Sequence, residues 1–380
     1  MEYKKINELT TVVTGGTPST RKNEYWDNGD IPWLQSGCCQ NCDVDSTEKY
    51  ITKEGYNNSS THMMSADTVM IALTGATAGK VGYLKFEACG NQSITGILPC
   101  ESLNQRYLFF YLLSQREKIL ADCVGGAQAH ISQSYVKNMT IPILAIKEQE
   151  QIVGELTKVS NIVSLRQEEI QQLDNLVKAR FVEMFGDCTN MISLSELCLI
   201  ITDGTHQSPK FQHDGIPFIL VSNLSKNTVT YDTDKFISAE TYKELYKRTP
   251  IEIGDILLST VGSYGHPAVV VEDRKFLFQR HIAYLKPKSD ILNSYYMHGA
   301  LLSPGCQRQI EEKVKGIAQK TLNLSEIRKI RIPVSSLDLQ KQYADFVHQV
   351  NKSKFDTMTF APIYAIINLY LHTYFYQGRR

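Results

Sequence analysis

The sequence predicts an α/β (α+β) fold, in which two duplicated globular domains are separated by long antiparallel coiled-coil helices with pseudo-twofold symmetry. Three features predict it: a repeat with an offset near 190 residues, short strand-like and helix-like stretches in each copy, and a heptad stretch between the copies. An offset of that size is far longer than a solenoid repeat, so it indicates duplicated domains.

The repeat is clearest at the end of each copy. Gly125–Gln128 leads there to Ile141-Pro142, and Gly316–Gln319 leads to Ile332-Pro333, at a constant offset of 191 residues. Gln128 and Gln319, placed alike in the two copies, are expected to brace a loop. Three earlier pairs of segments are also matched: Asp30–Leu34 with Gly215–Ile219, Met70–Gly75 with Ile256–Thr260, and Asn91–Ile94 with Phe278–His281.

Each copy shows short strands between Gly, Pro, Asn and Asp turns, and then helical stretches near residues 105–121 and 294–315. This mixture predicts two α/β domains, which we place at residues 1–147 and 188–338. Trp26 and Trp33 are expected in the core of the first domain.

A long helix is predicted at residues 148–187, where proline is absent and apolar residues recur four and three apart. A helix of this length with an apolar stripe needs a partner helix, which we expect in the C-terminal segment 339–380. Arg166 and Arg180 interrupt the stripe. The residues expected to pair the helices are Leu156, Val159, Val163, Ile170, Leu173 and Val177.

Composition indicates a cytoplasmic protein. No stretch is apolar enough for a membrane-spanning helix, and the start of the sequence lacks the apolar core of a signal peptide. The nine cysteines fit that compartment as free thiols. The cluster Cys38-Cys39-x-x-Cys42 raises the alternative of zinc, but a structural zinc site needs four ligands and no second such pair occurs, so we expect no metal.

Charge is balanced overall but differs between the copies. Lys and Arg number 12 against 14 Asp and Glu in residues 1–146, and 18 against 15 in residues 188–337. A protein that bound DNA alone through many phosphate contacts should be more basic. If this chain binds DNA, we expect another subunit to supply part of the phosphate contacts.

Catalytic motifs are missing from the sequence. The turn Gly75–Val81 has three residues between its glycines, where a phosphate loop has four, so it is expected to be a strand-to-strand turn. No Asn/Asp-Pro-Pro-aromatic tetrapeptide is present to hold a flipped adenine, and Glu311-Glu312-Lys313 lacks the preceding Pro-Asp pair of a nuclease. We therefore expect no catalytic residue in this chain.

The order of motifs resembles that of the specificity subunits of type I restriction–modification enzymes. Two globular domains alternate with two long helices, and each domain ends in a Gly-x-Ala-Gln loop and an Ile-Pro…Gln-x-Gln stretch. The openings of the two domains resemble those of target recognition domains, and they lie at Gly15–Ser19, Tyr25-Trp26, Gly29–Trp33, Asp203–His206, Ser208-Pro209 and Gly215–Phe218.

This resemblance implies a non-catalytic subunit that reads a bipartite sequence in double-stranded DNA. Each domain would read one half, and the helices would fix the gap. Two methyltransferase subunits would use S-adenosylmethionine, and motor-nuclease restriction subunits would use ATP and Mg²⁺, so we expect no cofactor in this chain and no membrane partner.

Base reading requires donors and acceptors on loops. In the first domain the residues expected to contact DNA are Thr17, Ser19, Lys22, Gln35, Ser36 and Lys80. In the second domain they are Thr205, His206, Lys210, Ser222, Asn223, Tyr264 and Arg280. His130 and His281 are expected to be polar loop or core residues, with DNA contact as the alternative.

The C-terminal tail departs from the family pattern. Pro362 would break or cap a helix, and the residues that follow are aromatic and poor in charge beyond about residue 355. This departure raises the alternative of an assembly-only or silent specificity subunit, whose altered tail prevents productive methylation. A self-sufficient methyltransferase-nuclease is a third class, which the missing motifs disfavour.

Overall fold

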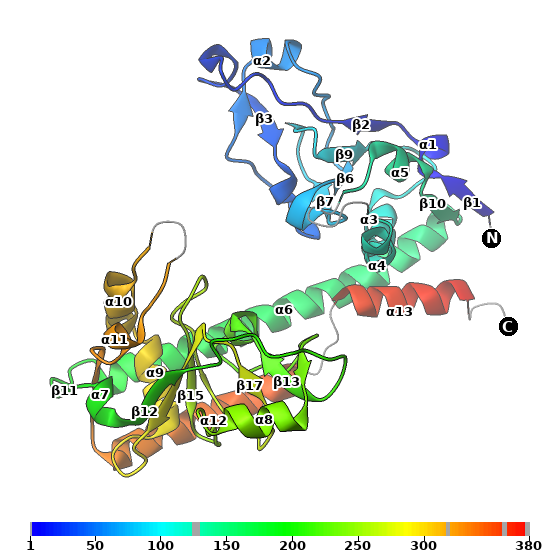
Figure 1. The fold of residues 1–380 in the computed structure, drawn as a ribbon. Helices are drawn as coiled ribbons and strands as arrows, with labels where there is room; N and C mark the ends of the chain where they lie inside the picture. Colours follow the sequence, from blue (N-terminus) through cyan, green and yellow to red (C-terminus); the bar gives the residue numbers. More distant parts are fainter. Residues whose placement is uncertain (1, 124–129, 317–319, 359–362, 377–380) are drawn as a thin grey trace. The chain divides into compact units, whose positions relative to one another are not determined.

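The computed structural model describes residues 2–123, 130–316, 320–358 and 363–376, which form two compact units (Figure 1). The first unit comprises Met1–Arg166 and Phe360–Arg380, and the second comprises Gln167–Thr359. The boundary falls inside the central helix α6, Ile146–Phe185, and the chain returns to the first unit at its C-terminal end. Two units that mix helices and strands confirm the predicted fold class.

The first unit is built on a five-stranded sheet in the order β2-β9-β6-β7-β4. Only β7 and β4 pair in parallel within it. The unit also contains two smaller sheets, β5-β3-β8 and β1-β10. The strands are β1 Glu2–Lys5, β2 Val12–Thr14, β3 Ile31–Leu34, β4 Cys42–Val44, β5 Tyr50–Ile51, β6 Val69–Ala72, β7 Val81–Leu84, β8 Cys89–Gly90, β9 Ile94–Ile97 and β10 Thr140–Ile143.

Helix α3 forms much of the core of the first unit, because residues 107–113 are all buried. The helical stretch expected near 105–121 is two helices that meet at Gln115. Trp33 is buried, whereas Trp26 is half-buried with its ring centroid 5.0 Å from that of Trp33. The helices are α1 Ile6–Leu9, α2 Lys53–Asn57, α3 Gln105–Ser114, α4 Arg116–Ala121 and α5 Gln133–Asn138.

The second unit repeats this topology. Its sheets β12-β18-β15-β16, β14-β13-β17 and β11-β19 match those of the first unit strand for strand, and β4 has no counterpart among the strands of the described residues. The strands are β11 Met191–Ser193, β12 Cys198–Asp203, β13 Ile216–Ile219, β14 Phe236–Ile237, β15 Ile256–Ser259, β16 Pro267–Val269, β17 Leu277–Phe278, β18 Ile282–Pro287 and β19 Arg331–Pro333.

The helices of the second unit follow the same order, and the stretch expected near 294–315 is again two helices. Pro304 occupies the first turn of the second of them, where its missing N–H costs no helical hydrogen bond. The helices are α7 Leu194–Leu197, α8 Ala239–Tyr246, α9 Ser294–Leu302, α10 Pro304–Lys313, α11 Leu324–Ile327 and α12 Leu337–Met358.

A buried glutamine closes each unit in the same way. Gln149 accepts a hydrogen bond from the amide of Asn104 at 2.8 Å and donates to two backbone carbonyls. Gln340, 191 residues later, accepts from the amide of Asn293 at 2.8 Å and also donates to two carbonyls. Both asparagines cap the following helix. The Gln-x-Gln motif therefore has its first glutamine inside the fold.

Replacing Gln340 with alanine should lower the free energy of unfolding of the second unit by about 1–3 kcal/mol, because three backbone groups around the buried Gln340 lose their partner. Gln342, two residues along the same helix, is exposed and provides the control. Hydrogen–deuterium exchange should show faster exchange in the second unit for Gln340→Ala alone. Equal exchange in the two variants would contradict this role.

The second half of α6 pairs with α12 inside the second unit. Lys354 of α12 forms an ion pair with Asp174, and the Tyr343 hydroxyl donates to the Val177 carbonyl at 3.4 Å. The later residue of α12 therefore meets the earlier residue of α6, so the two helices are antiparallel. Arg180, one of the two interrupting arginines, lies over the ring of Phe346 at 5.8 Å.

The C-terminal segment 339–380, which was expected to pair with the central helix, contains two helices in the structure. Helix α13, Ile363–Tyr376, belongs to the first unit, where it packs on α3 and beside the first half of α6 (Figure 1). Ile367 and Leu371 lie in the buried core of that unit, and Tyr370 donates to Glu155. Pro362 and the loops with Gln128 and Gln319 fall outside the described residues. None of the described helices is long and apolar enough to cross a bilayer.

Candidate nucleic-acid interface

In both units a glycine directly follows the first strand of the largest sheet, β2 or β12, and fixes the loop that begins there. The amide of Gly15 donates to Ile94 at 3.2 Å, and the amide of Gly204 donates to Ile282 at 3.1 Å. A Cβ atom would lie 2.1 Å from a backbone oxygen at the first position and 2.3 Å at the second. Only glycine allows this approach, so the two openings share one backbone frame.

These hydrogen bonds correct the alignment of the repeat. The next amide along each loop donates to the carbonyl of Gly90 in the first unit and of Phe278 in the second, which makes these two residues counterparts. Asn91–Ile94 therefore corresponds to Gln279–Ile282, and the alignment with Phe278–His281 was wrong by one residue.

The corrected register shows that two loop positions carry different side chains in the two units. Thr17 and Gln92 in the first unit correspond to His206 and Arg280 in the second. Gln92 was not predicted, because the one-residue shift hid its match with Arg280.

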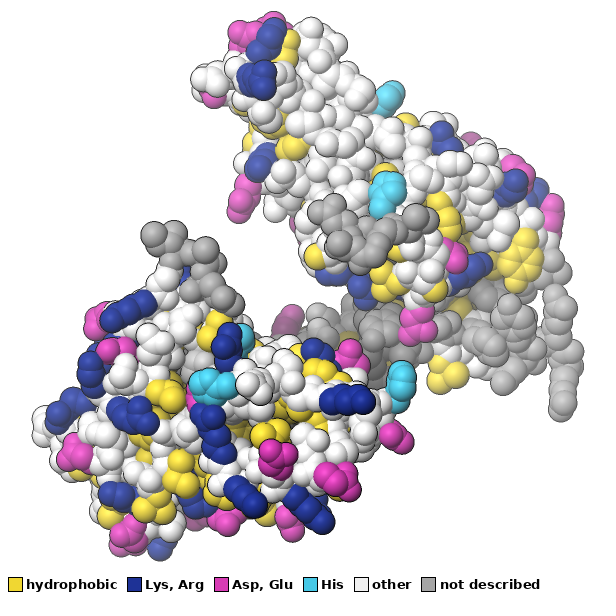
Figure 2. All heavy atoms as spheres, viewed as in Figure 1, with side chains coloured by type: hydrophobic (Ala, Val, Ile, Leu, Met, Phe, Trp, Pro, Cys, Tyr) yellow, Lys and Arg dark blue, Asp and Glu magenta, His cyan; other side chains and the backbone are white. Residues whose placement is uncertain are grey.

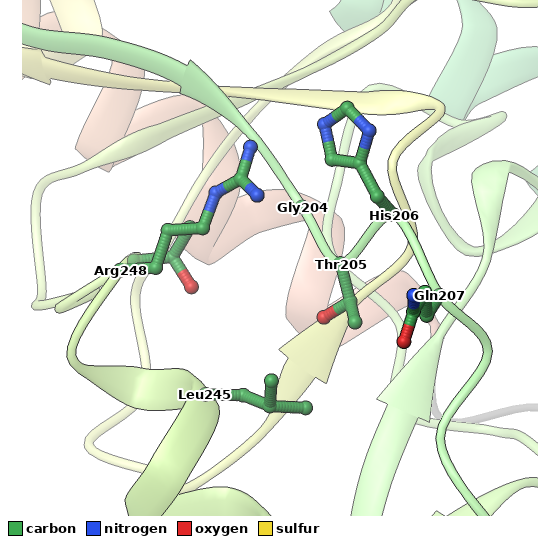
Figure 3. A pocket seen from close by; sticks show the side chains of 7 residues that line it. Gly204, Thr205, His206, Gln207, Leu245 and Arg248 are labelled. Atoms are coloured by element: carbon green, nitrogen blue, oxygen red, sulfur yellow. The ribbon is translucent and has the colours of Figure 1, made fainter.

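In the second unit a carboxylate holds an arginine and a histidine side chain at the loop. Asp203 accepts from Arg248 at 2.6 Å and from His206 at 2.9 Å, and Asp203 is less exposed than either partner. Figure 3 shows the Arg248 and His206 side chains on the two sides of the Gly204 backbone, beside a cavity of about 260 Å³. Arg248 was not predicted, although Lys247-Arg248 after α8 is a cationic pair that could have drawn attention.

Arg280 joins this cluster through the backbone. Its amide donates to the Thr205 carbonyl at 3.1 Å, and its Nε donates to Nε2 of His281 at 3.3 Å. Burial and the charge of Arg280 lower the pKa of His281, which favours the neutral ring that can accept this bond. The structure therefore brings Thr205, His206 and Arg280 together.

In the first unit the side chains at the same two positions are neutral and bond each other. The Thr17 hydroxyl donates to Oε1 of Gln92 at 2.5 Å, and both residues are exposed. Ser19 is exposed nearby in sequence, and its carbonyl accepts from the Trp26 indole at 3.1 Å. Hydrogen bonds to Tyr25 and then Glu24 raise the pKa of Lys22, which keeps that amine protonated. These are separate contacts, since no hydrogen bond or ion pair among the described residues joins Lys22 to Gln92.

Three further predicted residues of the first unit lie outside this pair. Gln35 is exposed and precedes the 3₁₀ turn Ser36–Cys38, in which Ser36 is half-buried. Lys80 donates to Oε1 of Gln40 at 2.6 Å. Gly75–Val81 is a turn between β6 and β7, as predicted from its glycine spacing.

The remaining predicted residues of the second unit differ in exposure. Lys210 and Ser222 are exposed, and Tyr264 is half-buried with Lys320 at 5.8 Å from its ring centre. Asn223 is buried, and its amide bonds Leu220, Thr230 and Asp232 in its own loop. Those bonds favour a structural role for Asn223, and its predicted DNA contact stays a prediction.

The residues expected to pair the helices divide between the two units. Leu156, Val163 and Val177 are buried, whereas Val159, Ile170 and Leu173 are half-buried. The seam misses Phe181 and Phe185, which are buried against Tyr296 and Tyr343 in the core of the second unit.

Lys and Arg side chains are spread over the face of the second unit that Figure 2 shows. Across the described residues, no group of three or more His, Cys, Asp or Glu side chains is placed to hold a metal ion. The nine cysteines are free thiols, as predicted. Both openings present polar loop side chains, Thr17 with Gln92 in the first unit and His206 with Arg280 in the second.

Comparison with protein families identifies the family to which the chain is similar. The model of the type I restriction modification DNA specificity domain matches residues 1–175 and 189–362. The chain belongs to this family. The two matched segments cover both duplicated halves, which confirms the resemblance inferred from the order of motifs.

Two relatives illustrate the extent of similarity. The chain is 32% identical over 169 residues to the type I restriction enzyme EcoR124I/EcoR124II specificity subunit of Escherichia coli, a match that spans 43% of the chain and 42% of that relative. It is 23% identical over 354 residues to the MjaIX specificity subunit of Methanocaldococcus jannaschii, spanning 86% of the chain and 81% of the relative. The chain thus matches less than half of the first relative's length.

The fold is similar to that of a solved specificity subunit. The crystal structure of the type I restriction-modification system S subunit from M. genitalium matches with a TM-score of 0.50 and 16% identity, covering 98% of this chain and 94% of that one. At this identity the match supports the shared fold.

Proposed function

We propose that this chain is the specificity subunit of a type I restriction–modification enzyme, and that it binds a bipartite sequence in double-stranded DNA. One observation carries the proposal: two units present different polar side chains, Thr17 with Gln92 and His206 with Arg280, on one duplicated backbone frame. A protein that reads two different half-sites needs this combination of a constant frame and variable side chains.

The chemistry is assigned to partner subunits. Two methyltransferase subunits would dock on the chain and methylate adenine with S-adenosylmethionine, and restriction subunits would add an ATP- and Mg²⁺-dependent motor and nuclease, all in the cytoplasm. The relatives named above are specificity subunits of type I restriction enzymes, which supports this division of labour. This chain would position DNA and partners without catalysing a step.

The decisive experiment is to co-express the chain with a methyltransferase subunit of its own system and to map methylated adenines by long-read sequencing. A two-part motif with a fixed unspecified gap is the expected result. Co-purification without methylation would instead support the assembly-only alternative. Failure to associate would remove the proposed function.

The packing of α13 bears on that alternative. An altered tail would prevent productive methylation most simply if it could not fold, but Ile367 and Leu371 of α13 are buried in the first unit. This favours an active specificity subunit over a silent one.

Replacing Arg248 with alanine should weaken DNA binding by the full chain and reduce the slope of log affinity against log salt by about 1, because one phosphate contact is lost. Half of the Arg248 side chain is exposed beside the cavity, so the guanidinium can reach a phosphate while Asp203 holds it. Fluorescence anisotropy over a salt series measures the slope. Arg248→Lys keeps the charge and should restore most of the slope, and an unchanged slope in Arg248→Ala would place the phosphate elsewhere.

A further inference from the structure

The duplicated position of Gln92 and Arg280 has the geometry of a base-selecting position. Each residue stands two places before the isoleucine that bonds the glycine of the opening loop, so each leaves the sheet at the same point of its unit. We propose that Gln92 reads an adenine in one half-site and that Arg280 reads a guanine in the other. This inference rests on the proposed function.

Each side chain makes one hydrogen bond that orients it, and the atoms that would contact a base remain available. Arg280 is exposed, and its only side-chain hydrogen bond to a described residue is that from Nε to His281, which leaves both terminal amino groups of the guanidinium to bind a ligand. Such a fork matches the two acceptors, O6 and N7, on the major-groove edge of guanine.

Gln92 is exposed and is oriented by Thr17. The Thr17 hydroxyl donates to Oε1, which fixes the direction of the amide and still leaves a second lone pair on that oxygen. An amide held in this way can accept from N6 of adenine and donate to N7 through Nε2, which is the pairing that glutamine makes in the major groove.

A phosphate contact is the competing role for Arg280. A charge-assisted phosphate contact at this position in both units would need a cation in both, but the first unit has the neutral Gln92 there. The neighbouring Arg248, held by Asp203, already provides a cation for the backbone. The difference between glutamine and arginine at one frame position is therefore better explained by two different bases.

The test is selection of bound duplexes from a random DNA pool by the full-length chain with its methyltransferase subunit. Arg280→Gln should convert one base pair of one half-site from G·C to A·T, and Gln92→Arg should make the reverse change in the other half-site. Other positions should be unchanged. Each preference should be about 5- to 150-fold, the range of a good bidentate pair.

Arg248→Gln removes the same charge at the neighbouring cation and is the matched control. It should weaken binding of all sequences alike and leave the selected motif intact. Arg280→Lys should keep the charge but reduce the preference for guanine, because it lacks the fork. An unchanged motif in Arg280→Gln and Gln92→Arg would overturn this inference while leaving the proposed function standing. If the wild-type complex selects no sequence, the proposed function fails, and this inference fails with it.

Discussion

Replacing Phe181 with alanine should lower the free energy of unfolding of the second unit by about 3–5 kcal/mol. The side chain is 3% exposed, and its ring centroid lies 5.3 Å from that of Tyr296 and 5.3 Å from that of Tyr343. The variant would lose both the transfer free energy of the ring and its contacts with the two tyrosine rings, and it would leave a cavity between α6, α9 and α12.

Val182 is the matched control for Phe181. It is the next residue of the same helix but is 46% exposed, so Val182→Ala should change the unfolding free energy by at most about 0.5 kcal/mol. Urea unfolding measures the total change, and hydrogen–deuterium exchange assigns it to the second unit. A small effect of Phe181→Ala, close to that of Val182→Ala, would show that the aromatic cluster is not a main source of stability.

The aromatic cluster also shows why the heptad pattern was incomplete. The pattern found Val177 because a coiled-coil seam selects aliphatic residues four and three apart. Phe181 and Phe185 lie on the same face of the helix as Val177. One of their partners, Tyr296, belongs to α9 of the globular fold and not to the paired helix α12. A two-helix rule therefore could not assign them, because this end of α6 is part of a domain core.

The candidate site was predictable where its residues are adjacent in sequence. The turn Asp203–His206 was found from its motif, and the structure brings it together with the predicted Arg280. Arg248 lies 45 residues from its partner Asp203 along the chain, so only the fold shows that they meet. Gln92 was missed because the alignment was wrong by one residue. Such a shift matches every residue of the loop with the wrong counterpart.

The tail departs from the family pattern in its sequence, but its position in the fold could not be predicted. A charge-poor aromatic segment after a proline fits either a damaged helix or a buried one. The deciding contacts are with α3, about 250 residues earlier in the sequence, and with Glu155, whose pKa is lowered by the hydrogen bond from Tyr370. Such long-range contacts leave no periodic signal in the segment itself.

Replacing Leu371 with alanine should lower the free energy of unfolding of the first unit by about 2–5 kcal/mol. Leu371 is 2% exposed and lies in the same core as the buried residues of α3 and of the first half of α6. Leu369, two residues earlier in α13, is 69% exposed, so the same change there should have an effect of at most about 0.5 kcal/mol.

This pair of variants tests whether the tail is a structural part of the first unit. Hydrogen–deuterium exchange should rise in α3 for Leu371→Ala and stay near the wild-type rate for Leu369→Ala. If the proposed division of labour holds, warming the Leu371→Ala complex should remove selection of the half-site with the adenine before the half-site with the guanine. Equal exchange in the two variants would mean that α13 does not stabilise the first unit, and the assembly-only alternative would then regain support.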